Sequence, residues 1–224
     1  MQISTDLFLL NSQMPNIKRI FLGNNKISAN VSQIFRGQWK SLTIFNMPNN
    51  SLYGSIPLSI GKISSLAQLE LHRNNLLGTI PKSLGRLRSL TVLKLSYIKL
   101  TGPIPLSLGS LSKLTNISLN NNALNGTILE SHFRSLKILK YLDLSSNKLT
   151  FMEKNKLTYK ISSNWTPPFD LDLLKLSHCQ IERALPLFLK TQSFMTTLDL
   201  SNNILTEQIS SLLWNLSKLK RLVL

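Results

Sequence analysis

The 224-residue chain contains one cysteine, so it has no intrachain disulfide framework. It has no CxxC motif, and its three histidines, His72, His132 and His178, lie far apart, without the spacing of a zinc site or of a Ser/His/Asp arrangement. The nine glycines occur singly, which excludes a phosphate-binding glycine loop. We therefore expect no enzyme activity, no bound metal and no cofactor.

Acidic residues are also scarce: 10 stand against 26 lysines and arginines, and the formal net charge is +16. Such a charge would suit a nucleic acid or another polyanion if it were concentrated in one patch. The basic residues are instead spread along the chain, and stacking aromatics and Arg/Gly runs are absent. We interpret them as a solvated outer surface and expect no nucleic-acid partner. Several of them precede the first leucine of a repeating unit: Lys62, Arg86, Arg88, Lys113, Lys137 and Lys218.

Long apolar runs are missing as well. Apolar residues come singly or in runs of about four, far short of the roughly 18 that a membrane-spanning helix needs. The opening segment MQISTDLFLLN has no basic region and only one apolar run, Leu7 to Leu10. We therefore expect any secretion signal or membrane anchor to lie outside this chain.

What the sequence does contain is a repeating unit, seen best in residues 66–81, LAQLELHRNNLLGTIP. The alternation around Leu69 and Leu71 predicts a short strand whose leucines point inward. Asn74 stands where the chain leaves this strand, and its amide can bond the backbone of neighbouring turns. Gly78 permits a tight backbone, and Pro81 fixes φ without donating a hydrogen bond. The unit is a leucine-rich repeat.

This unit recurs along the whole chain and predicts one domain, residues 1–224. About eight complete repeats start at residues 17, 42, 66, 90, 114, 139, 171 and 195, a ninth begins at 219, and an insertion occupies about 151–170. The expected fold is an α/β-type solenoid, a right-handed superhelix with a parallel concave sheet and a mostly irregular or short helical convex side. Neither terminus has a polar cap, so we expect the chain to be a piece of a longer array.

The residue that follows each strand defines a structural ladder inside the solenoid. The fourth repeat has Ile98 at this position, so one rung should be missing. In the seventh repeat Cys179 occupies it, and we prefer a small buried residue to a reactive thiol. The expected ladder residues are Asn25, Asn50, Asn74, Asn122, Asn147, Cys179 and Asn203.

The repeat L-x-x-L-x-L-x-x-N-x-L-x-G-x-I-P resembles the plant-specific class found in receptor kinases, receptor-like proteins and polygalacturonase inhibitors. Between Asn164 and Lys218 the segments NWTPPF, LKLSHCQI, ALPLFL, LDLS and LLWNLS, together with Gln192, are similar to receptor-like proteins of the xylanase-receptor type. Three positions depart from that family's usual glycine, tryptophan and proline: Arg183, Phe188 and Ser210.

The resemblance implies a cell-surface immune receptor with an extracellular solenoid, one membrane span and no kinase. Its partners would be a peptide or protein ligand and a co-receptor kinase. It would lie at the extracellular face of the plasma membrane or in the cell wall, given a signal peptide upstream. A second hypothesis is a secreted inhibitor that clamps a cell-wall-degrading enzyme, and the sequence leaves both open.

The outward residues of the concave strands are the candidate ligand-binding surface. Aromatic and guanidinium groups dominate binding energies, so the third and fourth repeats are the richest local cluster. The alternative is that a solvated sheet must expose polar groups in any case. The candidates are Arg19, Phe21, Gln68, Glu70, His72, Arg73, Lys94, Tyr97, Tyr141, Asp143, Lys175 and His178.

Six N-x-S/T sequons could accept glycans in a secreted protein. Composition alone would give about four, so their number is weak support for secretion. A glycan on Asn116 would stand on a concave strand and divide the surface. The sequons begin at Asn30, Asn49, Asn116, Asn125, Asn164 and Asn215.

Overall fold

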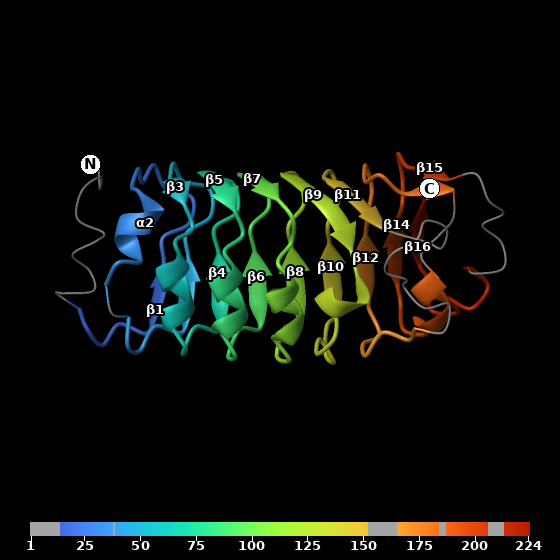
Figure 1. Cartoon of the computed structure of the whole chain (residues 1–224), viewed down its shortest axis with the longest axis horizontal. Helices are drawn as coiled ribbons and strands as arrows, with labels where there is room; N and C mark the ends of the chain where they lie inside the picture. Colours follow the sequence, from blue (N-terminus) through green and yellow to red (C-terminus); the bar gives the residue numbers. More distant parts are fainter. Residues whose placement is uncertain (1–13, 38, 152–164, 184–186, 206–212) are drawn as a thin grey trace.

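The structure is a computed structural model, which describes residues 14–37, 39–151, 165–183, 187–205 and 213–224. The described chain winds into an elongated solenoid, with its blue and red ends at opposite ends of the long axis (Figure 1). Successive coils lie side by side, and each contacts the next through equivalent elements. The predicted solenoid fold is confirmed.

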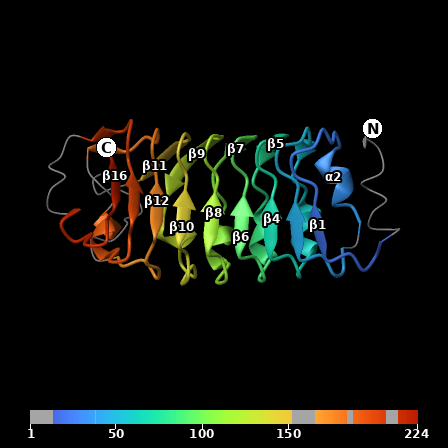
Figure 2. The same ribbon diagram turned by 180° about the vertical axis from the view of Figure 1, so that it is seen from behind.

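Nine short strands, one from each coil, form a single parallel sheet on the concave face (Figure 2). Equivalent residues pair directly, so Leu69 lies opposite Phe45 on one side and Leu93 on the other. Their side chains are buried, whereas the flanking residues of each strand face outward. The strands are β1 Arg19–Phe21, β2 Ile44–Asn46, β4 Gln68–Glu70, β6 Val92–Lys94, β8 Asn116–Ser118, β10 Tyr141–Asp143, β12 Leu173–Lys175, β14 Thr197–Asp199 and β16 Arg221–Val223.

A second parallel sheet, which the sequence did not predict, runs along the flank of the solenoid. Most of its strands begin one residue after the ladder position, as at Asn75, whereas the strand after Asn50 begins only at Tyr53. In the strand from Asn75, Leu76 points inward and Gly78 adopts a φ of +86°. The five-stranded part consists of β3 Tyr53–Ser55, β5 Asn75–Thr79, β7 Lys99–Gly102, β9 Ala123–Ile128 and β11 Lys148–Phe151. A separate pair is formed by β13 Glu182–Arg183 and β15 Ile204–Leu205.

Among the residues that the structure describes, the convex side carries the short α-helix α2 and a row of 3-10 helices, as expected. Proline precedes η1, η2 and η3 as the N-cap residue, because it fixes φ and no hydrogen bond is needed from its nitrogen there. The helices are α2 Val31–Ile34, η1 Leu58–Lys62, η2 Lys82–Arg86, η3 Leu106–Ser110, η4 Glu130–His132 and η5 Leu187–Thr191.

Glycine sets the distance between neighbouring 3-10 helices. A Cβ atom on Gly85 would lie 2.5 Å from the backbone oxygen of Ser107 in the next coil. The same approach joins Gly61 to Ser83 and Gly109 to Ser131. The Ser-Leu-Gly step of the repeat is therefore a packing contact between coils.

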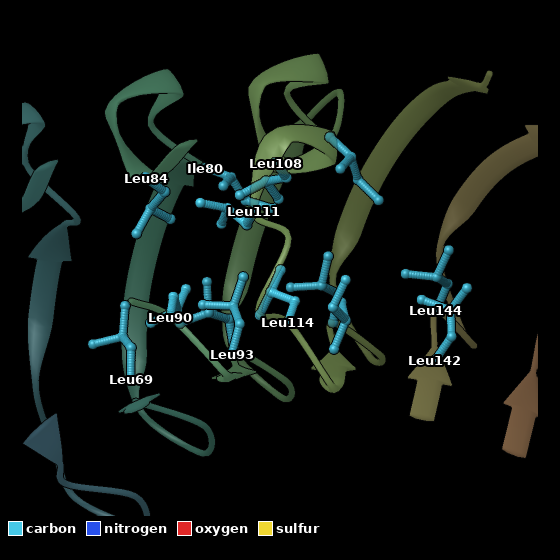
Figure 3. Close-up of a cluster of buried hydrophobic side chains, with 14 of the residues drawn as sticks. Leu69, Ile80, Leu84, Leu90, Leu93, Leu108, Leu111, Leu114, Leu142 and Leu144 are labelled. Carbon is cyan, nitrogen blue, oxygen red and sulfur yellow. The ribbon is translucent and has the colours of Figure 1, made fainter. Parts of the chain in front are cut away.

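Leucine and isoleucine side chains from both sheets and from the helices fill one continuous core (Figure 3). Strand residues such as Leu69 and Leu93 and helix residues such as Leu84 and Leu108 belong to this one cluster. Each buried leucine contributes about 2 kcal/mol relative to an exposed one, so the core supplies most of the stability.

The asparagine side chains connect successive coils in the described chain. Asn74 accepts a hydrogen bond from the Leu52 N–H (2.9 Å) and donates to the Met47 carbonyl of the preceding coil (2.9 Å) and to Leu71 of its own (3.0 Å). The same three kinds of bond are made by Asn50, Asn122, Asn147 and Asn203.

Three ladder positions differ from this pattern. Asn25 is exposed and donates to two carbonyls of its own turn, Leu22 and Gly23. Ile98 is buried and offers no hydrogen bond from its side chain. Cys179 is also buried, and its thiol donates to the Leu144 carbonyl at 3.4 Å, in place of an amide.

Threonine supplies a second series of links between coils, at the residue before strands β2, β6, β8 and β14. The Thr91 hydroxyl donates to the Ala67 carbonyl of the preceding coil at 2.9 Å, and the Thr115 hydroxyl donates to that of Thr91 at 3.0 Å. Thr43 and Thr196 make equivalent bonds. These hydrogen bonds were not predicted from the sequence, although the threonines recur at the same spacing as the leucines.

The insertion predicted at about 151–170 falls mostly outside the described residues, which resume at Trp165. The Trp165 ring stacks on Phe133 with centroids 6.0 Å apart and meets Phe188 edge-on, also at 6.0 Å. Phe169 contacts Phe133 at 5.5 Å. Gln192 is fully buried and accepts the Leu171 N–H at 2.8 Å. Trp165 and Phe169 therefore anchor the chain after the insertion to neighbouring coils.

Candidate functional site

The outward residues of the nine-stranded sheet form one surface, and the candidates lie on it or at the ends of its strands. Arg19 and Phe21 are exposed on β1. Gln68 and Glu70 belong to β4 and are half-buried. His72 and Arg73 follow β4, because this strand ends at Glu70, earlier than the sequence indicated.

Glu70 and Lys94 form an ion pair between adjacent strands, with Nζ 3.2 Å from Oε2. The glutamate side chain is 12% exposed and the lysine side chain 36%. Both charges are therefore engaged with each other on the sheet surface, and water screens the pair only in part.

Arg73 and Tyr97 occupy equivalent positions in neighbouring coils. The Arg73 guanidinium carbon lies 5.0 Å from the centroid of the Tyr97 ring, a cation–π contact. Both residues have positive φ, 55° and 52°, and both are exposed. They form the aromatic and cationic part of the surface, which we call the Arg73–Tyr97 pair.

His72 lies between this pair and the ion pair. Burial lowers the pKa of His72, the nearby Glu70 opposes this shift, and Lys94 and Arg73 add to the lowering. The imidazole therefore loses its proton more readily than a free one. Its Nδ1 atom is buried and has no hydrogen-bond partner among the described residues.

A second group of charges lies on β10, β12 and β14. Burial raises the pKa of Asp143, while hydrogen bonds from Ser145 and the charge of Lys175 lower it. Asp199 accepts hydrogen bonds from the N–H and the hydroxyl of Ser201, at 3.1 and 2.7 Å. The carboxylates of Asp143 and Asp199 thus stand on the two strands beside Lys175. Tyr141 on β10 and His178 after β12 are exposed at the same surface.

A further contact, which was not predicted from the sequence, lies just before the N-terminal ends of these strands. Lys140 Nζ lies 3.6 Å from Asp172 Oδ1 and 5.8 Å from the centroid of the exposed Phe194 ring. These residues precede strands β10, β12 and β14, so the repeat spacing alone would have placed them together.

The sequons differ in their surroundings. Asn30 is the N-cap of α2, and its side-chain oxygen accepts bonds from the N–H and hydroxyl of Ser32. Asn49 donates to Asn24 at 2.8 Å, whereas Asn125 and Asn215 are exposed. Asn116 is half-buried on β8, in the middle of the concave sheet. Asn164 lies outside the described residues.

Within the parts of the chain that the structure describes, no group of His, Cys, Asp or Glu side chains is arranged to hold a metal ion. No helix among those residues is long and apolar enough to cross a membrane. The geometry offers a broad, mixed-charge surface with two local groups of side chains, which suits the binding of an extended partner.

Comparisons with known proteins agree with this architecture. The family model described as Leucine Rich Repeat matches residues 65–87 and 194–216. Receptor-like protein EIX1 of Solanum lycopersicum is 38% identical over 88 residues, which are 39% of this chain and 8% of that protein. The chain thus matches less than a tenth of the length of this relative.

Two solved structures share the fold over almost the whole chain. The ectodomain of the Arabidopsis receptor kinase HAESA, in complex with an IDA peptide hormone ligand, has a TM-score of 0.78 and 28% identity, covering 98% of this chain and 35% of that chain. The ectodomain of the Arabidopsis thaliana receptor kinase GASSHO1/SCHENGEN3, in complex with CASPARIAN STRIP INTEGRITY FACTOR 2, has a TM-score of 0.70 and 30% identity, covering 94% and 27%. The chain is a plant-type leucine-rich repeat protein, and within that class it is similar to the receptor-like proteins.

Proposed function

We propose that this chain is an extracellular ligand-recognition segment of a plant receptor-like protein, and that it binds a peptide or protein on its concave face. The observation that carries the proposal is the side-chain group on β4 and β6 and just after them, where an ion pair and a cation–π pair stand on adjacent coils. Parallel strands place such side chains about 4.8 Å apart, a spacing that suits an extended polypeptide.

A binding role fits this surface better than a catalytic one. Glu70 and His72 are the nearest approach to an acid–base pair, but Glu70 is bound to Lys94. The Lys94 side chain is 36% exposed, so water reaches this pair, whereas an active site excludes water. The similar HAESA ectodomain holds a peptide hormone, which supports a polypeptide ligand for this chain.

The proposal includes a co-receptor kinase as a second partner and a place at the cell surface or in the cell wall. One similar structure contains the HAESA ectodomain with both a peptide hormone and the co-receptor SERK1. The exposed sequons at Asn125 and Asn215 would carry glycans in that compartment, away from the residues of β4 and β6.

The test is a binding screen of the full chain against secreted plant peptides and microbial cell-wall-degrading enzymes. For each binder found, alanine substitutions of Tyr97, Glu70 and Lys175 are compared with Lys82→Ala on the outer helix η2. We expect a concave anchor to weaken binding by about tenfold or more, and Lys82→Ala to change little beyond the salt dependence.

Two outcomes would replace the proposal. If the outer lysines dominate binding and the concave substitutions have no effect, the surface is a general polyanion-binding one. If the binder is an enzyme whose activity falls on binding, the secreted-inhibitor hypothesis takes its place.

A further inference from the structure

We infer that the Arg73–Tyr97 pair is an anion-binding site, and that the ligand places an acidic side chain, aspartate or glutamate, on the Arg73 guanidinium. The inference rests on the proposed concave-face binding and adds the chemistry of one ligand residue. Three observations support it: the backbone conformation at both positions, the free donors of Arg73, and the charge of the surrounding strands.

The backbone places large side chains where most coils have small ones. In eight coils the residue just before the ladder position has positive φ. Five of these residues are asparagine or serine, which tolerate this conformation or are small: Asn24, Asn49, Asn121, Ser146 and Asn202. The other three, Arg73, Tyr97 and His178, are bulky, and Arg73 and Tyr97 stand on two successive coils. Unfavourable conformations of this kind are concentrated at functional sites.

The guanidinium of Arg73 contacts Tyr97, but its N–H donors remain available to a ligand. The Arg73 guanidinium carbon lies over the Tyr97 ring, 5.0 Å from its centroid, and this contact restricts the position of the group. Within the described residues, neither of the two ion pairs involves Arg73, and no side chain receives a hydrogen bond from it. A planar fork with five N–H donors matches a carboxylate in a two-bond arrangement.

The local charge also favours an anion. Strands β1, β2, β4, β6 and β8 contain one carboxylate, Glu70, and it is paired with Lys94. Arg19 and Arg73 remain uncompensated, so this half of the sheet is positive and attracts acidic groups. Burial lowers the pKa of His72, so this imidazole favours its uncharged form more than a free one does. The other half differs, because Lys175 stands between Asp143 and Asp199.

The experiment is an NMR titration of the isotope-labelled full chain with two short peptides, acetyl-Gly-Glu-Gly-amide and acetyl-Gly-Gln-Gly-amide. The backbone amides of residues 72–74 and 96–98 report binding. We expect saturable shifts with the glutamate peptide and about fivefold weaker binding of the glutamine peptide, the factor expected of one exposed charge pair. Equal responses to the two peptides would overturn the inference.

Substitutions locate the site. Arg73→Asn removes the guanidinium and suits positive φ, so the chain should fold and lose the preference for glutamate. Tyr97→Asn should keep the preference but weaken it, because the ring no longer orients Arg73. Arg86→Asn is the matched control, because it also removes one positive charge, but from η2. This substitution should leave the preference for the glutamate peptide unchanged.

The result separates this inference from the proposed function. If Arg73→Asn retains the glutamate preference, or Arg86→Asn reduces it equally, the anion site is wrong and the effect is general electrostatic attraction. If concave substitutions weaken a natural binder while the two short peptides behave alike, the binding face stands and only the acidic contact is refuted. If the outer lysines carry natural binding, the proposed function fails, whatever the peptides do.

Discussion

The Leu52 N–H donates to the side-chain oxygen of Asn74 in the next coil at 2.9 Å, and the amide nitrogen of Asn74 donates back to Met47. The Asn74 nitrogen also donates to the Leu71 carbonyl of its own coil, so one buried side chain satisfies backbone groups in two coils at once. A repeat whose interior contains few other polar side chains depends on this exchange, because an unpaired buried backbone group is costly.

Asn74→Ala should destabilise the chain by about 1 to 3 kcal/mol, since the Leu52 N–H would lose its partner in a buried position. Urea unfolding followed by circular dichroism measures the change. Asn25→Ala is the matched control, because Asn25 is exposed and bonds only within its own turn. Equal effects of the two substitutions would contradict the role of Asn74 between coils.

The Arg73–Tyr97 pair should respond non-additively to asparagine substitutions. Each substitution relieves about 1 kcal/mol of backbone strain, and either one removes the cation–π contact, about 0.5 to 1 kcal/mol. Arg73→Asn and Tyr97→Asn should therefore be nearly neutral alone. The double variant loses the contact once and should be about 1 kcal/mol more stable than the wild type. Unfolding of all four proteins tests this, and a double variant no more stable than the wild type would speak against strain at these positions.

Gly85→Ala should destabilise the solenoid by about 1 to 3 kcal/mol, because the new methyl group would overlap the Ser107 backbone of the next coil. The thermal midpoint of Gly85→Ala is compared with that of Ser64→Ala, an exposed substitution. An unchanged thermal midpoint would mean that adjacent 3-10 helices can move apart without a loss of stability.

Cys179 should make stability fall at alkaline pH. Burial raises the pKa of its thiol from 9.0 to about 12, so the unfolded chain releases this proton first as the pH rises. The contribution is fully present below pH 9 and is lost between about pH 9 and 12, by about 1.4 kcal/mol per unit at most. Unfolding of the wild type and of Cys179→Ala at several pH values isolates this effect from other titrating groups. Parallel pH profiles would show that the thiol ionises equally well in the folded chain.

Trp165→Ala should loosen the coils on both sides of the insertion, by about 2 kcal/mol for a half-buried ring. Hydrogen exchange should increase around η4 and η5, while β2 and β4 stay protected, since each repeat contacts only its neighbours. Trp214→Ala is the control, with a ring that is 80% exposed. Uniform loss of protection along the chain would argue for one cooperative unit instead.

The leucine and asparagine spacing was sufficient to predict the solenoid, the concave sheet and the burial of Leu69, Asn74 and Cys179. The flank sheet was not predicted, because a stretch such as Asn75–Thr79 has only one inward leucine and alternation over so few residues is ambiguous.

The candidate surface was predicted residue by residue, but its internal contacts were not. The two residues of each contact, Glu70 with Lys94 and Arg73 with Tyr97, are 24 residues apart. This is one repeat length, so their proximity could have been inferred from the sequence. What it could not supply is the positive φ before each ladder residue, which directs Arg73 toward the neighbouring coil. The packing of Trp165 between Phe133 and Phe188 was likewise hidden, because the insertion breaks the repeat spacing.

The repeats that begin at residues 42, 66 and 90 are all 24 residues long, and their hydrogen bonds run from each coil to equivalent atoms of the next. A gene that gained or lost one such unit between Tyr97 and Asp143 would encode a chain in which every strand still has its neighbour. The Arg73–Tyr97 pair would then move relative to Asp143 by one strand spacing, about 4.8 Å. The distance between the two groups of contacts can thus evolve in fixed steps, so that the solenoid would select ligands by length as well as by charge.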